Sequence, residues 1–206
     1  MLSLFCALSL SWNLGIRVFL VMSGMILLGI FYSIPIIPSG IRHLSRYVKI
    51  KDIPGSKTLL EAIAWAVVIT LVPLLTAGDI HWPAVSVTFF VILSIAFFRI
   101  AFFDLFQVQG DLIVGVETLP ISIGEKRTIS ILKWILVFNG ALLVIAPIFK
   151  IVSTFSLLLL ACFVTLALCM TAYVKRRIYP GTFLEALVEG NLFLAGLLSI
   201  IWLILT

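Results

Sequence analysis

Residues 83–103 read PAVSVTFFVILSIAFFRIAFF, an apolar run that contains a single charged residue, Arg99. A helix rises about 1.5 Å per residue, so about 20 apolar residues cross a hydrocarbon core of about 30 Å. Comparable apolar stretches recur along the chain. The six that meet this length lie at about 18–37, 59–77, 83–103, 130–149, 152–174 and 187–206. The sequence therefore predicts an all-α, polytopic membrane bundle of about six transmembrane helices.

The composition agrees with this prediction. Of the 206 residues, 63% are hydrophobic and 11% are charged, whereas an ordinary soluble domain has roughly 25% charged residues. A mean hydropathy of +1.28 leaves too little polar surface for a soluble globule, a disordered chain or a coiled coil. The three cysteines lie in apolar runs without metal-ligand spacing, which excludes a disulfide or zinc framework. The net charge of +5 falls in short loops, so we expect no nucleic-acid partner.

The N-terminal part of the chain is apolar before the first long segment begins. Residues 1–11 are too short to span and lack the basic flank of a signal peptide, so they predict a short N-terminal helix. The next segment should be helical only to about Tyr32, because Pro35 and Pro38 stop a helix. No repeats or long linkers appear, and residues 1–206 are expected to form a single domain.

Basic residues alternate between the loops in the way that six consecutive crossings require. The 41–57 loop carries five Lys or Arg residues, the 104–129 loop ends in a Lys-Arg pair and the 175–186 loop begins with three basic residues. The two intervening loops contain at most one, Lys150. By the positive-inside rule, loops 41–57, 104–129 and 175–186 face the cytoplasm together.

Acidic residues follow the apolar run 83–103. Asp104, Gln107 and Asp111 are spaced i, i+3, i+7, and they project from one face if the helix continues past residue 103. Two carboxylates and an amide directed at one point suit a hard cation such as Mg²⁺. The alternative is that these residues are solvated just beyond a helix end, helped by Gly110, and spacing alone does not decide between the two.

The basic loop on the same side of the membrane adds a second charged surface. A polyphosphate neutralised by Mg²⁺ on one flank and by Lys or Arg on the other would use both loops. Topology and anionic lipid head groups are a sufficient explanation for part of this charge, but Pro54 and Gly55 should fix Lys57 at the start of the next helix. The candidate diphosphate-binding residues are Arg42, Arg46, Lys49, Lys51 and Lys57.

Other polar residues have less specific interpretations. Arg99 lies about a turn before Asp104 and either pairs with it or reaches a phosphate. Glu61 lies one turn into its helix, where the helix dipole favours a structural role. Asn139 and Asn191 lie in or beside apolar helices and are expected to form interhelical hydrogen bonds.

The run DLFQVQGDLIVGVETLPISIG, residues 104–124, resembles the second aspartate-rich motif of UbiA-type intramembrane prenyltransferases, D-x-x-D-x-x-G-D-x-x-x-G-x-x-T-L-P. The YSIP sequence at Tyr32–Pro35, followed by basic residues, is similar to another cytoplasmic loop of that family. With the six apolar segments, the resemblance covers nearly the whole chain. The residues in register are Asp104, Gly110, Asp111, Gly115, Thr118, Leu119, Pro120 and Gly124.

The resemblance implies a UbiA-like bundle whose central cavity opens to the lipid bilayer. It also implies Mg²⁺-dependent transfer of a prenyl group from an isoprenyl diphosphate to a hydrophobic acceptor, often an aromatic ring. Asp104, Gln107 and Asp111 would be the catalytic positions, with the metal on the two aspartates. Tyr32 and Arg99 would line the cavity, and an aromatic face such as that of Tyr32 would stabilise the prenyl cation.

The chain departs from the family pattern in two ways. Gln107 replaces a customary aspartate and is a weaker, neutral ligand. The first motif, N-D-x-x-D-x-x-x-D, has no counterpart, as if the chain began inside the family's third helix. We therefore expect an N-terminally truncated chain, a partner chain that supplies the first helices, or a homologue without catalysis. The alternative function is a non-catalytic scaffold or a lipid- or quinone-binding partner. A transporter subunit is less favoured, because no matched pair of broken helices is present.

Overall fold

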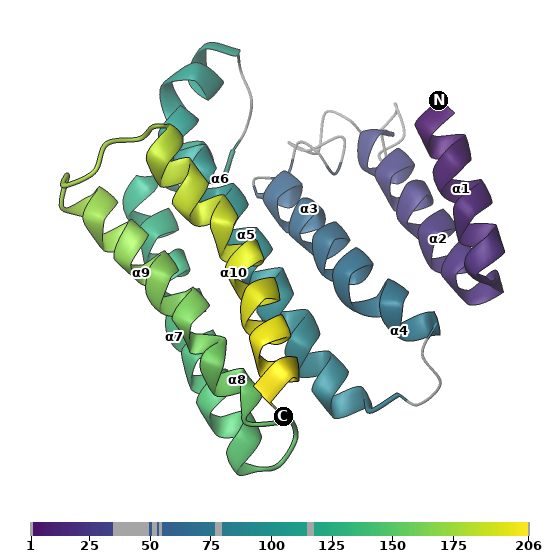
Figure 1. Cartoon of the computed structure of the whole chain (residues 1–206). Coiled ribbons are helices and arrows are strands. Elements are labelled where there is room, and N and C mark those ends of the chain that lie inside the picture. Colours follow the sequence, from purple (N-terminus) through teal and green to yellow (C-terminus); the bar gives the residue numbers. More distant parts are fainter. Residues whose placement is uncertain are drawn as a thin grey trace.

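The computed structural model describes residues 2–34, 50, 53, 55–76, 80–114 and 118–205. These residues form helices and no strand, which confirms the predicted all-α bundle (Figure 1). The N-terminal helices are α1 (Leu2–Leu14), α2 (Ile16–Ser33), α3 (Ser56–Ala66), the π-helical turn η3 (Val67–Leu71) and α4 (Val72–Thr76). They are followed by α5 (Trp82–Val114), α6 (Leu119–Ile123), α7 (Glu125–Ile148), α8 (Phe155–Leu158), α9 (Leu160–Val174) and α10 (Thr182–Leu205).

Five of the six predicted spans are long and apolar enough to cross a membrane: Ser56–Leu75, Trp82–Val114, Glu125–Ile148, Phe155–Val174 and Thr182–Leu205. The first predicted span, 18–37, forms only the shorter apolar helix α2. Helix α2 ends at Ser33, and Ile34 is extended with φ −82° and ψ 139°. This is the conformation that a following proline imposes, so the predicted helix end is confirmed to within one residue.

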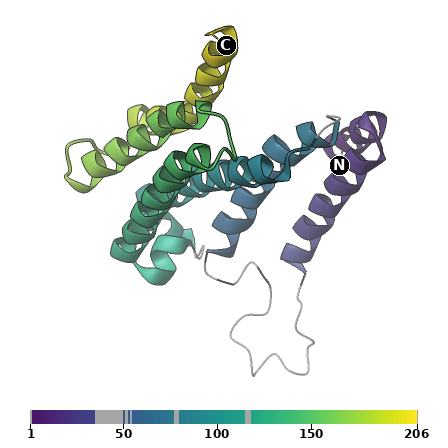
Figure 2. The same cartoon turned by 90° about the horizontal axis from the view of Figure 1, so that it is seen from below.

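Helices α1 and α2 form a hairpin at the edge of the bundle, which Figure 2 shows from below. Gly15, with φ +121°, connects them, and Trp12 contacts Phe19 edge-on at a centroid distance of 5.1 Å. The short N-terminal helix predicted from residues 1–11 is thereby confirmed. Helix α2 contacts α4, which joins this hairpin to the other helices.

Helix α5 is the central helix, and it corrects one predicted boundary. Its 33 residues pack against α3, α6, α7 and α10. Residues 104–114 are helical rather than part of a 104–129 loop, because α5 continues through Gly110 to Val114. The core around α5 is apolar; it includes Phe98, Phe102, Leu132, Leu143, Phe163, Leu166, Leu184 and Val188.

Small buried residues of α3, namely Thr58, Ala62 and Ala66, line its interface with α5. Small side chains allow membrane helices to approach closely, because lipid provides no hydrophobic force that would press larger ones together. The two helices run in opposite directions, so the start of α3 lies beside a later part of α5 than the end of α3 does. The paired residues are Thr58 with Asp104, and Ala62 with the Ala96–Ile100 turn.

A π-helical turn, η3, interrupts the first of the five long spans, Ser56–Leu75. The backbone N–H of Val72 bonds to the carbonyl of Val67, and the hydroxyl of Thr70 donates to the carbonyl of Ala66. Pro73 follows directly and has no N–H to donate to the preceding turn, which favours a widened turn at this position.

Polar asparagines connect neighbouring helices, as predicted. The Nδ2 of Asn139 on α7 donates to Ser94 Oγ on α5 at 2.8 Å. Asn191 on α10 accepts a hydrogen bond from Thr165 Oγ1 at 3.0 Å and donates to the Cys162 carbonyl at 3.0 Å. Each asparagine therefore joins its helix to a neighbouring helix by side-chain hydrogen bonds.

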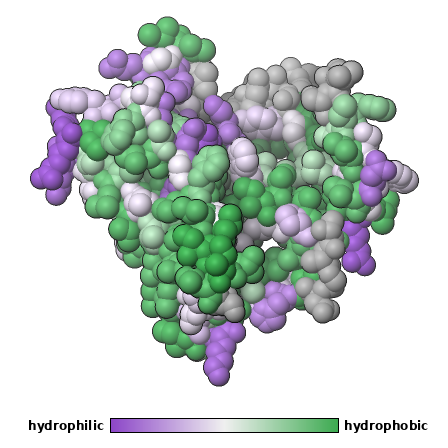
Figure 3. All heavy atoms as spheres, in the orientation of Figure 1, coloured by the Kyte–Doolittle hydropathy of each residue, from purple (hydrophilic) through white to green (hydrophobic). Residues whose placement is uncertain are grey.

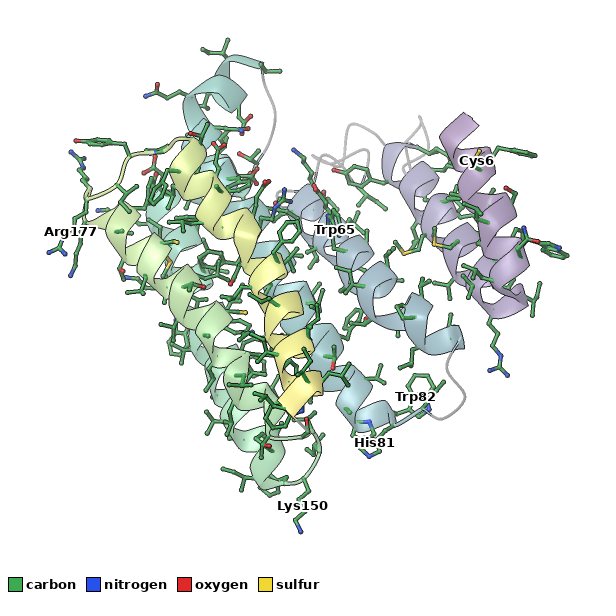
Figure 4. The ribbon with its side chains drawn as sticks, viewed as in Figure 1. Cys6, Trp65, His81, Trp82, Lys150 and Arg177 are labelled. Carbon is green, nitrogen blue, oxygen red and sulfur yellow. The ribbon has the colours of Figure 1, made fainter. Side chains whose placement is uncertain are left out.

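The described helix ends alternate between two sides of the bundle. Helices α2, α5 and α9 end, and α3 and α10 begin, at the upper end of Figure 1. Lys150 and Arg177 project from opposite ends (Figure 4). Apolar residues cover most of the middle of the face in Figure 3, and hydrophilic residues lie toward its upper end and its lower edge.

Candidate functional site

The candidate site begins with the acidic stripe, which we define as Asp104, Gln107 and Asp111 on α5. Because α5 is continuous to Val114, these residues lie on one side of the helix rather than beyond its end. Asp104 is buried at 7% exposure, Asp111 is half-buried and Gln107 is exposed. The stripe thus runs from the buried helix interface to the surface over about two turns.

The first turn of α3 meets the buried end of the acidic stripe. Thr58, which is 1% exposed, donates a hydrogen bond from Oγ1 to Oδ2 of Asp104 at 3.2 Å. The Lys57 ammonium group interacts favourably with the Asp104 carboxylate, whereas the negative charges of Asp111 and Glu61 oppose it. A cation and several carboxylates from two distant segments are therefore brought to one place.

The start of helix α6 packs against the start of α3. Gly55 precedes α3 with φ +75°, a conformation that favours glycine. A Cβ atom at Gly55 would lie 2.7 Å from Cδ1 of Leu119, so the Leu119 side chain packs directly over this glycine. Thr118, Leu119 and Pro120 are all buried. The T-L-P part of the motif is thus a packing element that holds α6 against the start of α3.

Most of the predicted basic residues lie outside the described part of the chain. Four of them, Arg42, Arg46, Lys49 and Lys51, are outside the described residues, and their role in binding diphosphate stays a prediction. Lys57 is the member of this set that the structure places, and its side chain is exposed beside the acidic stripe.

Tyr32 and Lys57 line one cavity although they come from different helices. The cavity has a volume of about 250 Å³ between α2 and α3, and Glu61 also lines it. The remaining lining residues are apolar and include Met25, Leu28 and Ile63 among others. Glu61, which the sequence suggested to be structural, therefore faces the same space as the candidate residues Tyr32 and Lys57.

Arg99 pairs with Glu189 of α10 rather than with Asp104. The Nη2 to Oε1 distance is 2.7 Å, and the guanidinium lies 5.3 Å from the centre of the Phe103 ring. Both charged side chains line a cavity of about 370 Å³ between α3, α5 and α10. Trp65 lines the same cavity, and Figure 4 shows it between α3 and α10.

Sequence reasoning missed Thr58, Glu189 and Trp65. The signal for Thr58 was its spacing from Ala62 and Ala66, because a stripe of small residues marks a close helix interface. The signal for Glu189 was a carboxylate within an apolar helix, which needs a partner in a membrane. Its pairing with Arg99 depends on tertiary structure and had no signature in the sequence.

The oxygen atoms of Asp104, Gln107 and Asp111 suit a metal ion that the substrate also helps to bind. Among the described residues, no group of three or more His, Cys, Asp or Glu could hold a metal ion by itself. Mg²⁺ is usually bound by one or two carboxylates together with substrate phosphates and waters. Asp104 and Asp111, with the Gln107 carbonyl nearby on the same helix, fit that mode.

Comparison with known proteins agrees with the aspartate-rich motif of residues 104–124. No curated protein and no solved structure matches the chain. The model of the UbiA prenyltransferase family matches residues 1–203. The matched range contains both the acidic stripe and the first turn of α3, and it confirms the resemblance seen in residues 104–124. The chain belongs to the UbiA prenyltransferase family.

Proposed function

We propose that this protein is an intramembrane prenyltransferase that uses Mg²⁺ to transfer a prenyl group from its diphosphate to a hydrophobic, aromatic acceptor. The observation that carries the proposal is the hydrogen bond from Thr58 to Asp104, with the positive charge of the neighbouring Lys57 acting on the same carboxylate. This arrangement joins a cation and a candidate metal ligand at the end of an apolar bundle, where a substrate with a charged head and an apolar tail would bind.

The charged head of the substrate is held from two sides. Asp104 and Asp111, with Gln107, would hold Mg²⁺, which when bound neutralises negative charge on the departing diphosphate. Lys57 neutralises the other side of the diphosphate, and Arg42, Arg46, Lys49 and Lys51, which lie outside the described residues, stay candidates for the same role. The buried Thr58 is a positioning residue, because its hydroxyl fixes Oδ2 of Asp104.

The reaction breaks the bond between the allylic carbon and the diphosphate oxygen, and the bonding electrons leave with the diphosphate. The acceptor ring forms a new bond to that carbon and releases a proton. Lys57 stabilises the developing negative charge. The apolar walls beside it keep water from the positive prenyl fragment, and the Tyr32 ring lies in the cavity that Lys57 lines, where its face would stabilise that fragment.

Binding of a non-reactive isoprenyl thiodiphosphate tests the proposal on the full chain in detergent. We expect binding that requires Mg²⁺ and that weakens about tenfold in Asp111→Asn, the change that 1.4 kcal/mol produces. Glu125→Gln, an exposed carboxylate in the first turn of α7, is the matched control and should bind like the wild type. Binding that ignores both magnesium and Asp111→Asn would contradict the proposal and support a non-catalytic, lipid-binding protein.

A further inference from the structure

A groove of about 410 Å³ lies between α9 and the first turns of α10, and we call it the α9–α10 groove. The residues that line it within the two membrane spans are mostly apolar and include Leu168, Ala172 and Leu187. Lys175 and Arg177 line its outer end, just after α9 ends. The groove shares no lining residue with the cavities described at the candidate site, so it is a separate feature of the molecule.

The turn after α9 brings the two cations to the groove. Arg176 has φ +54°, a left-handed conformation that glycine usually adopts at the end of a helix. The N–H of Arg177 donates to the Ala172 carbonyl and that of Arg176 to the Tyr173 carbonyl, each at 2.9 Å, which is the Schellman pattern. The chain therefore folds back on the last turn of α9 at the edge of the bundle, where Figure 4 shows Arg177. Lys175 and Arg177 line the groove, whereas Arg176 between them does not.

No acidic side chain among the described residues neutralises these two cations. The ion pair that the described residues form joins Arg99 to Glu189, and no described carboxylate lies within ion-pair distance of Lys175 or Arg177. Both basic side chains are exposed. Glu185, in the first turn of α10, does not line the groove. The outer end of the groove is therefore positively charged and open to an anion.

The inner part of the groove suits an apolar chain. Leu168 and Lys175 are seven positions apart, so the groove extends about 10 Å along α9 from its charged end at 1.5 Å per residue. The hydroxyl of Thr171, which also lines the groove, donates to the Leu168 carbonyl at 3.0 Å and needs no partner on a ligand. The best occupant thus has an anionic head attached to an apolar chain.

We propose that the α9–α10 groove binds a phospholipid of net negative charge from the membrane leaflet at this end of the bundle. Its phosphate lies between Lys175 and Arg177, and one acyl chain follows Leu168 and Leu187. The positive-inside rule accounts for basic residues at this end, but it does not require two of the three to line an apolar groove. The inference goes beyond the proposed function and does not depend on it.

The experiment is native mass spectrometry of the full chain in detergent with equal amounts of dioleoylphosphatidylglycerol and dioleoylphosphatidylcholine. The two lipids share their acyl chains and phosphate but differ in net charge. We expect phosphatidylglycerol to remain bound in preference. Lys175→Gln and Arg177→Gln should each weaken its binding about fivefold, the change that about 1 kcal/mol per basic residue produces. Arg176→Gln is the matched control and should bind like the wild type, because it removes the same charge from the same turn outside the groove.

A second pair of variants tests the path of the acyl chain. Ala172→Leu places a larger side chain in the groove and should weaken phosphatidylglycerol binding about tenfold, the change that 1.4 kcal/mol of exclusion produces. Ala161→Leu is the control, because Ala161 is exposed earlier on α9 and does not line the groove. Binding that persists in Ala172→Leu would overturn the placement of the acyl chain.

The remaining outcomes decide whether the groove is a specific lipid site. Equal losses in Arg176→Gln, Lys175→Gln and Arg177→Gln would show a general attraction to basic residues and would overturn the site. Equal binding of the two lipids would overturn the role of net charge. Displacement of phosphatidylglycerol by an equal concentration of glycerol 3-phosphate, which has no acyl chains, would show a site for free anions instead.

Discussion

At the scale of single residues, the hydrogen bond from Thr58 to Asp104 is the most informative contact. Both residues are buried, so removing the hydroxyl leaves Oδ2 of Asp104 without this donor. We expect Thr58→Val to lower the free energy of unfolding by about 1–3 kcal/mol and to weaken Mg²⁺-dependent binding of an isoprenyl thiodiphosphate. Denaturation in detergent and a binding titration measure the two effects.

Thr58→Ser is the control for this change, because it keeps the hydroxyl and removes only a methyl group. We expect it to restore most of the binding that Thr58→Val loses. If serine and valine weaken binding equally, the methyl group rather than the hydrogen bond would matter at this position.

Gly55 tests the contact between the start of α3 and α6. An alanine there would adopt φ +75° and place its Cβ 2.7 Å from Leu119 Cδ1. We expect Gly55→Ala to destabilise the protein by more than the roughly 1–2 kcal/mol that the left-handed conformation alone costs. Leu119→Ala is measured alongside, because it removes the crowding atom without changing the turn at Gly55.

Adding Leu119→Ala to Gly55→Ala removes the crowding atom. The double variant should therefore lose less stability than the sum of the losses in Gly55→Ala and Leu119→Ala, as measured by thermal unfolding in detergent. Losses that simply add in the double variant would show that Leu119 does not press on this turn.

At the scale of helices, the close packing of α3 on α5 depends on small side chains. Ala62 is fully buried against Ala96 and Ile100. We expect Ala62→Leu to destabilise the protein by about 1–3 kcal/mol, because the added carbons have no space at this interface, and to weaken diphosphate binding by separating Thr58 from Asp104. Ala186→Leu, on the exposed face of α10, is the control and should change neither property.

Sequence patterns predicted the helices but not all of their ends. The stop before Pro35 was predictable, because a proline acts on its neighbour through local geometry. The extension of α5 to Val114 was not, because Gln107, Gly110 and Asp111 are equally typical of a loop. Contacts with α3 and α6, from far apart in the sequence, accompany this extension.

The candidate site, too, was predictable from the sequence only in part. The positions of Asp104 and Asp111 on one side of a helix follow from spacing. The hydrogen bond of Asp104 to Thr58 and the pairing of Arg99 with Glu189 join residues separated by 46 and 90 positions. Such partners depend on how helices are arranged, which periodicity does not encode.

At the scale of the whole molecule, the two ends of the bundle should face different compartments. Lys150 and Arg177 lie at opposite ends in Figure 4. In a Cys6→Ser background, in which the remaining Cys162 and Cys169 are buried, we expect a membrane-impermeant maleimide to label Arg177→Cys only from the cytoplasmic side. Lys150→Cys should react only from the other side, and labelling of both from one side would contradict the predicted orientation.

The π-helical turn Val67–Leu71 changes which face of the helix meets each of its two neighbours, α5 and α2. A turn that holds one extra residue advances the rotational phase of everything after it by about 100°. Before the turn, Thr58 and Ala62 face α5; after it, α4 meets α2. Deleting a single residue from this turn would return the helix to one continuous register, and the peripheral hairpin would then be presented with the wrong side of α4.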